Sequence, residues 1–280
     1  MIPVWGFITR CWGGIARAAA GAAGSGPEAI DLDVPSAQTL VREYLRLYFT
    51  DSVPKAGKDG DVAARLVTSL ARNLGQATTY KTMIQGMYGA EADPASLITE
   101  ETLASYLSLL KSSYLVDEVP GWVPPARSRK RLATKPKRYL ADPSLAAAQL
   151  GMDPDALIRD WQTFGLRFES LCMRDLMVYA QVLPNVGFEP IRYYRDDTGL
   201  EADAIVELSD GRWAAFEFKV SEDKVESGVE NLLRLRRKLC EKARARTREP
   251  EFLAVVTGIS KYARQTPEGV YVIPIRCLTA

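Results

Sequence analysis

Two carboxylates and a lysine can meet on one face of a predicted β-hairpin. Residues 200–220, LEADAIVELSDGRWAAFEFKV, read as two strands of alternating polarity joined at 209–211. A two-residue turn would put Asp203 and Glu217 on opposite faces, whereas a three-residue loop with Gly211 in the left-handed conformation sets them directly across from each other. The three-residue loop also unites the apolar faces of the two strands. We therefore expect that register.

The two carboxylates and Lys219 suit metal-assisted chemistry on a phosphate. Asp203 and Glu217 at cross-strand distance repel each other unless a cation lies between them. Mg²⁺ prefers oxygen ligands and binds through one or two carboxylates plus phosphate. Lys219 could orient an attacking water or offset charge that develops on a phosphoryl group. The alternative is a solvent-facing Glu-x-Lys pair on an amphipathic strand, a common arrangement.

The alternation predicts one apolar and one polar face for this hairpin. The apolar face carries Leu200, Ala202, Ala204, Val206, Leu208, Ala214, Phe216, Phe218 and Val220. The opposite face carries Glu201, Asp203, Glu207, Trp213, Glu217 and Lys219.

This motif resembles the core of the PD-(D/E)xK, restriction-endonuclease-like superfamily. The runs 194–196, 199–207 and 213–219 more closely resemble a C-terminal domain of unknown function that follows the ATPase module in prokaryotic AAA-type ATP-binding proteins. The resemblance extends over most of the chain from about residue 40. It implies that Glu169, on the helix before the strands, completes the acidic cluster as a catalytic residue. The alternative is a surface glutamate paired with Arg167 or Arg174.

Periodicity and the resemblance together divide the chain into three parts. Residues 1–36 are an Ala/Gly-rich remnant or linker, residues 37–142 a helical and winged-helix domain, and residues 143–280 a restriction-endonuclease-like domain. The predicted fold class is α+β, with a helical winged helix-turn-helix domain followed by an α/β restriction-endonuclease-like domain. Helices are expected at 37–50, 61–73, 78–87, 99–112, one long helix at 155–180 and a basic helix from 222 to about 246; strands are expected at 114–119, 190–195, the motif hairpin, 252–256 and 270–275.

Basic residues before the second domain are the predicted nucleic-acid contacts. The stretch from 127 to 138 holds seven basic residues in twelve and no acid, a pattern that favours phosphate binding. The predicted contacts are Arg127, Arg129, Lys130, Arg131, Lys135, Lys137 and Arg138, together with Lys111 on the exposed face of the predicted recognition helix. The alternative is that the stretch pairs with acids of the neighbouring domain.

Composition excludes several classes of protein. The 280 residues include no histidine, which removes histidine-metal nucleases, Ser-His-Asp triads and Cys-His proteases. The four cysteines are widely spaced, so a zinc site or disulfide framework is not expected and a reducing cytoplasm fits best. A net charge of +1 says nothing about an anionic partner. No segment has the length of a membrane span.

No phosphate-binding loop of the type G-x-x-x-x-G-K-[ST] is present, so we expect neither ATP binding nor ATPase activity. The chain resembles a truncated member that lacks the ATPase module or meets it as a partner. We expect a DNA-associated prokaryotic protein with an Mg²⁺-dependent nuclease-like domain, in which Asp203 and Glu217 hold the metal. A catalytically inactive DNA-binding or regulatory module is the alternative, and a purely structural interaction module is the third.

Overall fold

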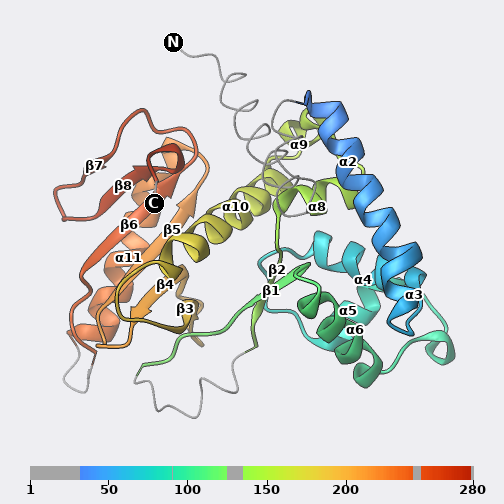
Figure 1. The fold of residues 1–280 in the computed structure, drawn as a ribbon. Coiled ribbons are helices and arrows are strands. Elements are labelled where there is room, and N and C mark those ends of the chain that lie inside the picture. Colours follow the sequence, from blue (N-terminus) through green and yellow to red (C-terminus); the bar gives the residue numbers. More distant parts are fainter. Residues whose placement is uncertain (1–31, 90, 125–134, 242–246, 279–280) are drawn as a thin grey trace. The chain divides into compact units, whose positions relative to one another are not determined.

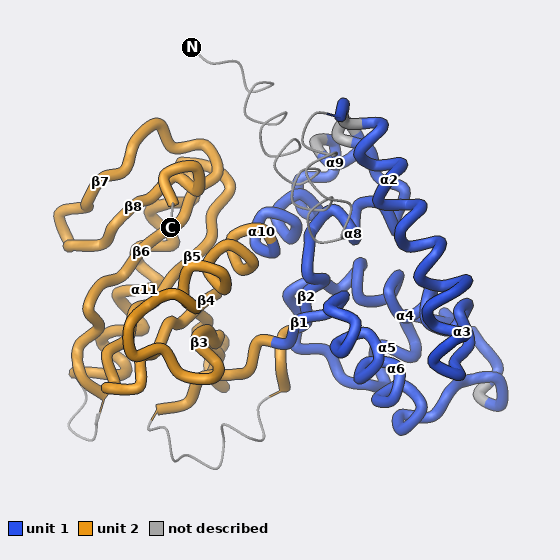
Figure 2. The backbone as a smooth tube through the Cα atoms, viewed as in Figure 1, with its two compact units in different colours: residues 1–118, 138–170 blue, residues 119–137, 171–280 orange. Residues whose placement is uncertain are grey.

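The computed structural model describes residues 32–89, 91–124, 135–241 and 247–278 (Figure 1). The chain forms two compact units, residues 1–118 with 138–170 and residues 119–137 with 171–280 (Figure 2). The two units alternate along the sequence, since residues 119–137 belong to the second unit and residues 138–170 to the first. No helix within the described ranges has the length and apolar character that a membrane crossing requires.

The first unit is mainly helical. Its helices are α2 (Val34–Leu47), a π-helical turn (Tyr48–Ser52), α3 (Val53–Lys55), α4 (Gly60–Arg72), α5 (Tyr80–Tyr88), a 3₁₀ turn (Pro94–Ser96), α6 (Glu100–Ser112), α8 (Pro143–Gln149) and α9 (Pro154–Arg159). The strands β1 (Val116–Val119) and β2 (Lys137–Leu140) form a two-stranded sheet. The predicted order of three helices followed by a strand is therefore present as α4, α5, α6 and β1.

Side-chain caps and apolar stripes explain where these helices form. Asp59 and Thr99 cap α4 and α6 by accepting hydrogen bonds from backbone N–H groups of the first turn. Apolar residues at helical spacing, such as Leu66 and Leu70 of α4 and Leu103 of α6, are buried in one common core.

The prediction of a single helix over residues 155–180 is wrong, because the helix is interrupted at Asp160. There the backbone leaves the helical region, with φ −105° and ψ 80°. The carboxylate of Asp160 accepts a hydrogen bond from the backbone N of Thr163 at 3.0 Å, so it acts as the N-cap of a new helix. That helix is α10 (Trp161–Gln181).

The second unit is built on a six-stranded mixed sheet in the order β3-β4-β5-β6-β8-β7. The strands are β3 (Val186–Arg195), β4 (Glu201–Leu208), β5 (Trp213–Lys219), β6 (Phe252–Thr257), β7 (Arg264–Gln265) and β8 (Tyr271–Pro274). β3, β4 and β5 are antiparallel, β5, β6 and β8 are parallel, and β7 is antiparallel to β8. α11 (Val225–Cys240) connects β5 to β6 after a 3₁₀ turn (Glu222–Lys224), and a second 3₁₀ turn (Ile275–Cys277) follows β8.

The predicted register of the β4–β5 hairpin is confirmed. Ala204 pairs with Phe216 and Glu207 with Trp213, a register that sets Asp203 across from Glu217. The loop closes with a hydrogen bond from the backbone N of Leu208 to the carbonyl of Arg212 at 2.8 Å. Gly211 has φ +82°, the left-handed conformation that the three-residue loop requires.

The predicted polar face of this hairpin is in fact largely covered. Because β5 and β6 are parallel, the chain must cross over between them, and α11 makes that crossover. Ile205 and Ala215, on the face that holds Glu217, are buried with Val229 and Leu232 of α11 in one core cluster. The acidic residues of this face are therefore set among packed side chains.

Candidate active site

A bulge in β4 lies at Asp203. Arg192 and Tyr194 of β3 pair with Ile205 and Ala202 of β4. The segment of β4 between these pairs is therefore one residue longer than the segment of β3 that it faces. The Oδ2 atom of Asp203 accepts a hydrogen bond from the backbone N of Phe218 at 2.8 Å. Bulges re-aim side chains and are over-represented next to active sites. The bulge thus turns the Asp203 carboxylate towards β5, next to Glu217.

Glu217 is a buried carboxylate with a partner on each oxygen. The residue is only 3% exposed. Its Oε2 atom lies 2.8 Å from Nζ of Lys219, and its Oε1 atom accepts a hydrogen bond from Nδ2 of Asn231 at 2.6 Å. Glu217 is thus held in one orientation from both its own strand and α11.

Burial raises the pKa of Glu217 to about 8, and the negative charge of Asp203 adds to this rise. Lys219 and the hydrogen bond from Asn231 act in the opposite direction but only in part. At neutral pH the folded chain therefore favours the protonated form of Glu217.

A glycine on α11 makes room for the lysine. A Cβ atom at Gly228 would lie 3.4 Å from Cε of Lys219 and 3.2 Å from Cγ2 of Val255. Glycine weakens a helix interior, and here it allows α11 to lie close against β5 and β6. The side chain of Lys219 is 27% exposed, so its ammonium group reaches the edge of the buried cluster.

Asn231 is a residue of this cluster that the sequence interpretation missed. Its Nδ2 atom donates both to Glu217 and, at 2.5 Å, to the carbonyl of Glu201 on β4. Asn231 lies three residues after Gly228 and four before Leu235, which are both buried on the inner face of α11. An uncharged polar residue in the inward-facing row of an otherwise apolar helix was the available signal.

Glu169 has a different environment from the other three predicted catalytic residues. It lies on α10 within the first unit, and its Oε1 atom accepts a hydrogen bond from the hydroxyl of Tyr139 at 2.8 Å. Asp203, Glu217 and Lys219 all belong to the second unit. The structure therefore brings those three together and pairs Glu169 with Tyr139.

The acidic cluster offers a metal two carboxylates. In the part of the chain that the structure describes, no three Asp, Glu, Cys or His side chains are grouped to hold a metal ion. A cation at Asp203 and Glu217 would therefore complete its coordination with water, with backbone oxygen or with substrate oxygen, as Mg²⁺ commonly does.

Two of the predicted nucleic-acid contacts are buried, which corrects their assignment. Lys137 and Arg138 are each only 4% exposed. Nζ of Lys137 lies 2.7 Å from Oε1 of Glu201, and Nε of Arg138 lies 2.9 Å from Oε1 of Glu118. Burying such charges requires paired partners, so these side chains stabilise the fold and are not available to a phosphate.

The other predicted contacts are divided between an ion pair, an exposed side chain and undescribed residues. Lys111 is partly exposed and pairs with Glu118 at 2.6 Å. Lys135 is exposed. Arg127, Arg129, Lys130 and Arg131 lie outside the described residues.

Comparison with known families divides the chain into two segments. Residues 21–156 match the model of a domain of unknown function, DUF8612, and residues 164–278 match that of a second domain of unknown function, DUF4143. No curated protein and no solved structure matches the chain. DUF4143 is commonly found with AAA ATPases, in agreement with the resemblance of the second half. The segment that holds Asp203, Glu217, Lys219 and Asn231 is thus similar to an ATPase-associated domain family of unknown function.

Proposed function

We propose that the second unit is a nuclease-like domain that binds Mg²⁺ at Asp203 and Glu217 and hydrolyses phosphodiester bonds in DNA. The observation that carries this proposal is the β4–β5 register that sets the two carboxylates opposite each other, with Nζ of Lys219 2.8 Å from Oε2 of Glu217. The spacing of the three residues resembles the PD-(D/E)xK motif. The order of helix, antiparallel strands, helix and parallel strand in this unit supports it further.

The chemistry of these residues fits a divalent cation. The charge of Asp203 and the burial of Glu217 both act to raise the pKa of Glu217, so a cation that replaces the proton would relieve a repulsion already present. When bound, Mg²⁺ would polarise a phosphoryl oxygen and stabilise its developing negative charge. Asp203 and Glu217 are the residues that would hold it.

The remaining side chains have separate roles. Lys219 positions the attacking water or offsets charge on the phosphoryl oxygens, and Asn231 fixes the orientation of Glu217. The water oxygen bonds to phosphorus as the ester P–O bond breaks, which leaves an alcohol and a phosphate monoester. The proposal assigns no step to Glu169, whose Oε1 atom accepts a hydrogen bond from the hydroxyl of Tyr139.

DNA association would come from basic residues of the stretch 127–135 and from the first unit. The order of α4, α5, α6 and β1 supports a winged helix, a motif that places a helix in the major groove. Lys135 and the basic residues 127–131 are the phosphate contacts of this proposal. An AAA-type ATPase is the proposed partner, supported by the family match of residues 164–278.

A second candidate is a catalytically inactive regulatory module with the same fold. The observation that favours it is the burial of Glu217, whose two oxygens both have partners within the protein. In that case the cluster only fastens α11 to the sheet.

Cleavage of single- and double-stranded DNA in Mg²⁺ or Mn²⁺ distinguishes the two candidates. The chain would be compared with Asp203→Asn and Lys219→Met, each of which keeps the approximate shape of the side chain. Lys224→Met and Glu226→Gln are matched controls, because both residues are exposed and lie just after β5.

Loss of cleavage by at least about a hundredfold in both site variants, with both controls active, would support the nuclease. Absence of cleavage by the chain, with DNA binding retained, would favour the inactive module. Equal cleavage by every variant would indicate a contaminating enzyme and overturn the assignment of the site.

A further inference from the structure

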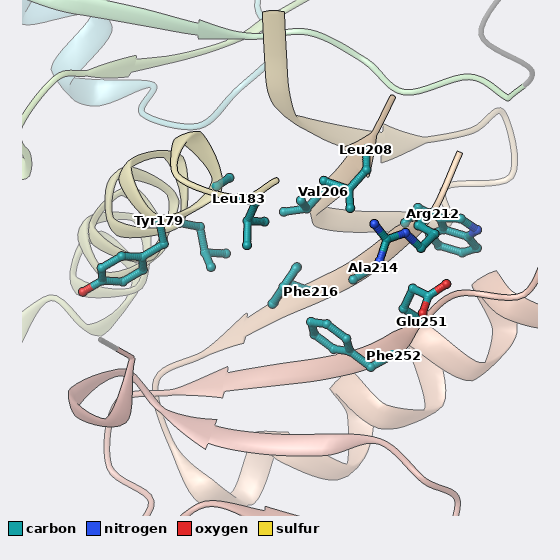
Figure 3. A pocket seen from close by; sticks show the side chains of 12 residues that line it. Tyr179, Leu183, Val206, Leu208, Arg212, Ala214, Phe216, Glu251 and Phe252 are labelled. Atoms are coloured by element: carbon teal, nitrogen blue, oxygen red, sulfur yellow. The ribbon is translucent and has the colours of Figure 1, made fainter. Parts of the chain in front are cut away.

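A cavity of about 450 Å³ lies in the second unit, on the side of the sheet opposite to the acidic cluster. The C-terminal half of α10 forms one wall with Leu176 and Tyr179. The sheet forms the other with even-numbered residues such as Val206 and Phe216, whereas Glu217 belongs to the odd-numbered face. Figure 3 shows Tyr179, Val206 and Phe216 among the side chains that line the cavity. The cavity is therefore distinct from the proposed nuclease site.

Small side chains account for the empty volume. Ala180 of α10 and Ala214 of β5 both line the cavity. Interiors are normally packed at the density of organic crystals, so leucine or isoleucine at these two places would be expected to close the space between helix and sheet. Two alanines instead leave a cavity within the ~300–1,000 Å³ range that holds small-molecule ligands.

The wall of the cavity is apolar and partly aromatic. The rings of Phe216 and Phe252 meet edge to face with centroids 5.6 Å apart. Phe252 and Leu183 remain 38% and 41% exposed, so apolar surface at the opening is in contact with water. Covering such surface with an apolar molecule is favourable, and aromatic walls favour ring contacts with another ring.

The charged side chains of the lining already have opposite charges beside them. Nε of Arg212 lies 2.8 Å from Oδ2 of Asp210, and Oε1 of Glu251 lies 3.1 Å from an amino group of Arg248. Among the described residues, the charged side chains of the lining are thus matched in pairs of opposite sign. A charged ligand would lose hydration on entry without gaining a dedicated counter-charge.

We propose that this cavity binds a neutral, largely apolar small molecule that carries an aromatic ring. The small side chains of Ala180 and Ala214 leave the volume that the ligand occupies, and Phe216 and Phe252 contact its ring. The paired charges at the rim select against an ionised ligand.

A pair of fluorescent probes tests both the site and the selectivity. N-phenyl-1-naphthylamine is neutral and becomes fluorescent in apolar surroundings, and 8-anilino-1-naphthalenesulfonate has the same ring framework with an added sulfonate. The full chain should bind the neutral probe with one-to-one stoichiometry and the sulfonate at least about tenfold more weakly, because the sulfonate has no unmatched cation to meet.

Variants that fill the cavity locate the binding. Ala214→Leu from the sheet side and Ala180→Leu from the helix side should each weaken binding of the neutral probe by at least about tenfold. Ala56→Leu adds the same side chain at an exposed position of the first unit and should leave binding unchanged. Near-ultraviolet circular dichroism establishes which variants keep their packing, and either filled variant that folds is sufficient.

No binding of the neutral probe by the folded chain would overturn the proposal, as would equal binding by a folded filled variant. Binding of the sulfonate as tightly as the neutral probe would overturn the assigned ligand class.

Discussion

Asn231 of α11 donates its side-chain amide to the carboxylate of Glu217 on β5, with 2.6 Å between Nδ2 and Oε1. The same amide nitrogen reaches the carbonyl of Glu201 on β4. One side chain thus connects the crossover helix to both strands of the motif hairpin. The orientation of Glu217 depends on this connection as well as on Lys219.

Replacement of Asn231 by alanine should destabilise the second unit. The change leaves the buried Oε1 atom of Glu217 without its partner, which costs about 1–3 kcal/mol. Urea unfolding followed by tryptophan fluorescence, to which the buried Trp122 and Trp213 of this unit contribute, measures the difference. Glu230→Ala is the control, because Glu230 is the exposed neighbour on the same helix and should change stability by less than about 0.5 kcal/mol. Equal effects of the two changes would contradict the role of Asn231.

The stability of the second unit should fall as the pH rises from about 4.5 to about 8. The pKa of Glu217 is raised from an ordinary 4.5 to about 8 in the folded chain, so between these values the folded state keeps a proton that the unfolded state has lost. The free energy of unfolding then decreases by up to ~1.4 kcal/mol per pH unit and levels off above the folded pKa.

Glu217→Gln removes this titration and should flatten the pH dependence over the same window. Glu226→Gln, at an exposed position of α11, serves as the control. A slope unchanged by Glu217→Gln would show that another group carries the dependence.

Much of the hairpin could be predicted from its sequence, because local rules determine it. A three-residue loop ending in Gly211 and the period-two alternation fix the register, and with it the meeting of Asp203 and Glu217. The bulge at Asp203 depends on how β3 pairs with β4, and the contact of Asn231 with Glu217 depends on how α11 lies against the sheet. That contact joins residues fourteen positions apart through tertiary packing, which no short pattern encodes.

The basic stretch 127–138, in contrast, contains residues whose role could not be predicted from the sequence. Charge is visible in a sequence and burial is not, so Lys137 and Arg138 resembled their exposed neighbours. Their positions on β2, within a strand that is buried throughout, separate them from Lys135. Likewise, Asp160 lies in a stretch whose apolar residues recur at helical spacing, so the sequence pattern predicts one continuous helix. The interruption comes from its side chain, which accepts a hydrogen bond from the backbone N of Thr163 and caps a new helix.

Lys137→Met should reduce stability and leave DNA affinity at the level set by the folded fraction. The change leaves Glu201 without its 2.7 Å partner, and because that carboxylate is 30% exposed the expected cost is about 1–3 kcal/mol. Arg236→Met is the matched control, since it breaks an exposed pair with Glu249 and should cost less than about 1 kcal/mol. A specific loss of DNA binding by folded Lys137→Met would contradict the buried assignment.

Tyr114→Gly should stabilise the first unit. Tyr114 has φ +56° at the C-terminal end of α6 and is 86% exposed. Its backbone N donates to the carbonyl of Lys111, and that of Leu115 donates to Leu110, a helix-ending motif in which glycine is preferred. Relief of the left-handed strain, less the backbone entropy of glycine, gives a gain of about 0.5–1 kcal/mol. Tyr114→Ala keeps the Cβ atom and should bring no such gain in the free energy of unfolding. A gain as large as that of Tyr114→Gly would show that the left-handed conformation of Tyr114 is not strained.

Binding of Mn²⁺, a spectroscopic substitute for Mg²⁺, tests the central claim most directly. Electron paramagnetic resonance of free Mn²⁺ counts the ions bound per chain without reference to activity. We predict one bound ion per chain, lost in the double variant Asp203→Asn with Glu217→Gln and retained in Glu226→Gln. The same stoichiometry and affinity in the double variant would show that Asp203 and Glu217 are not the metal ligands.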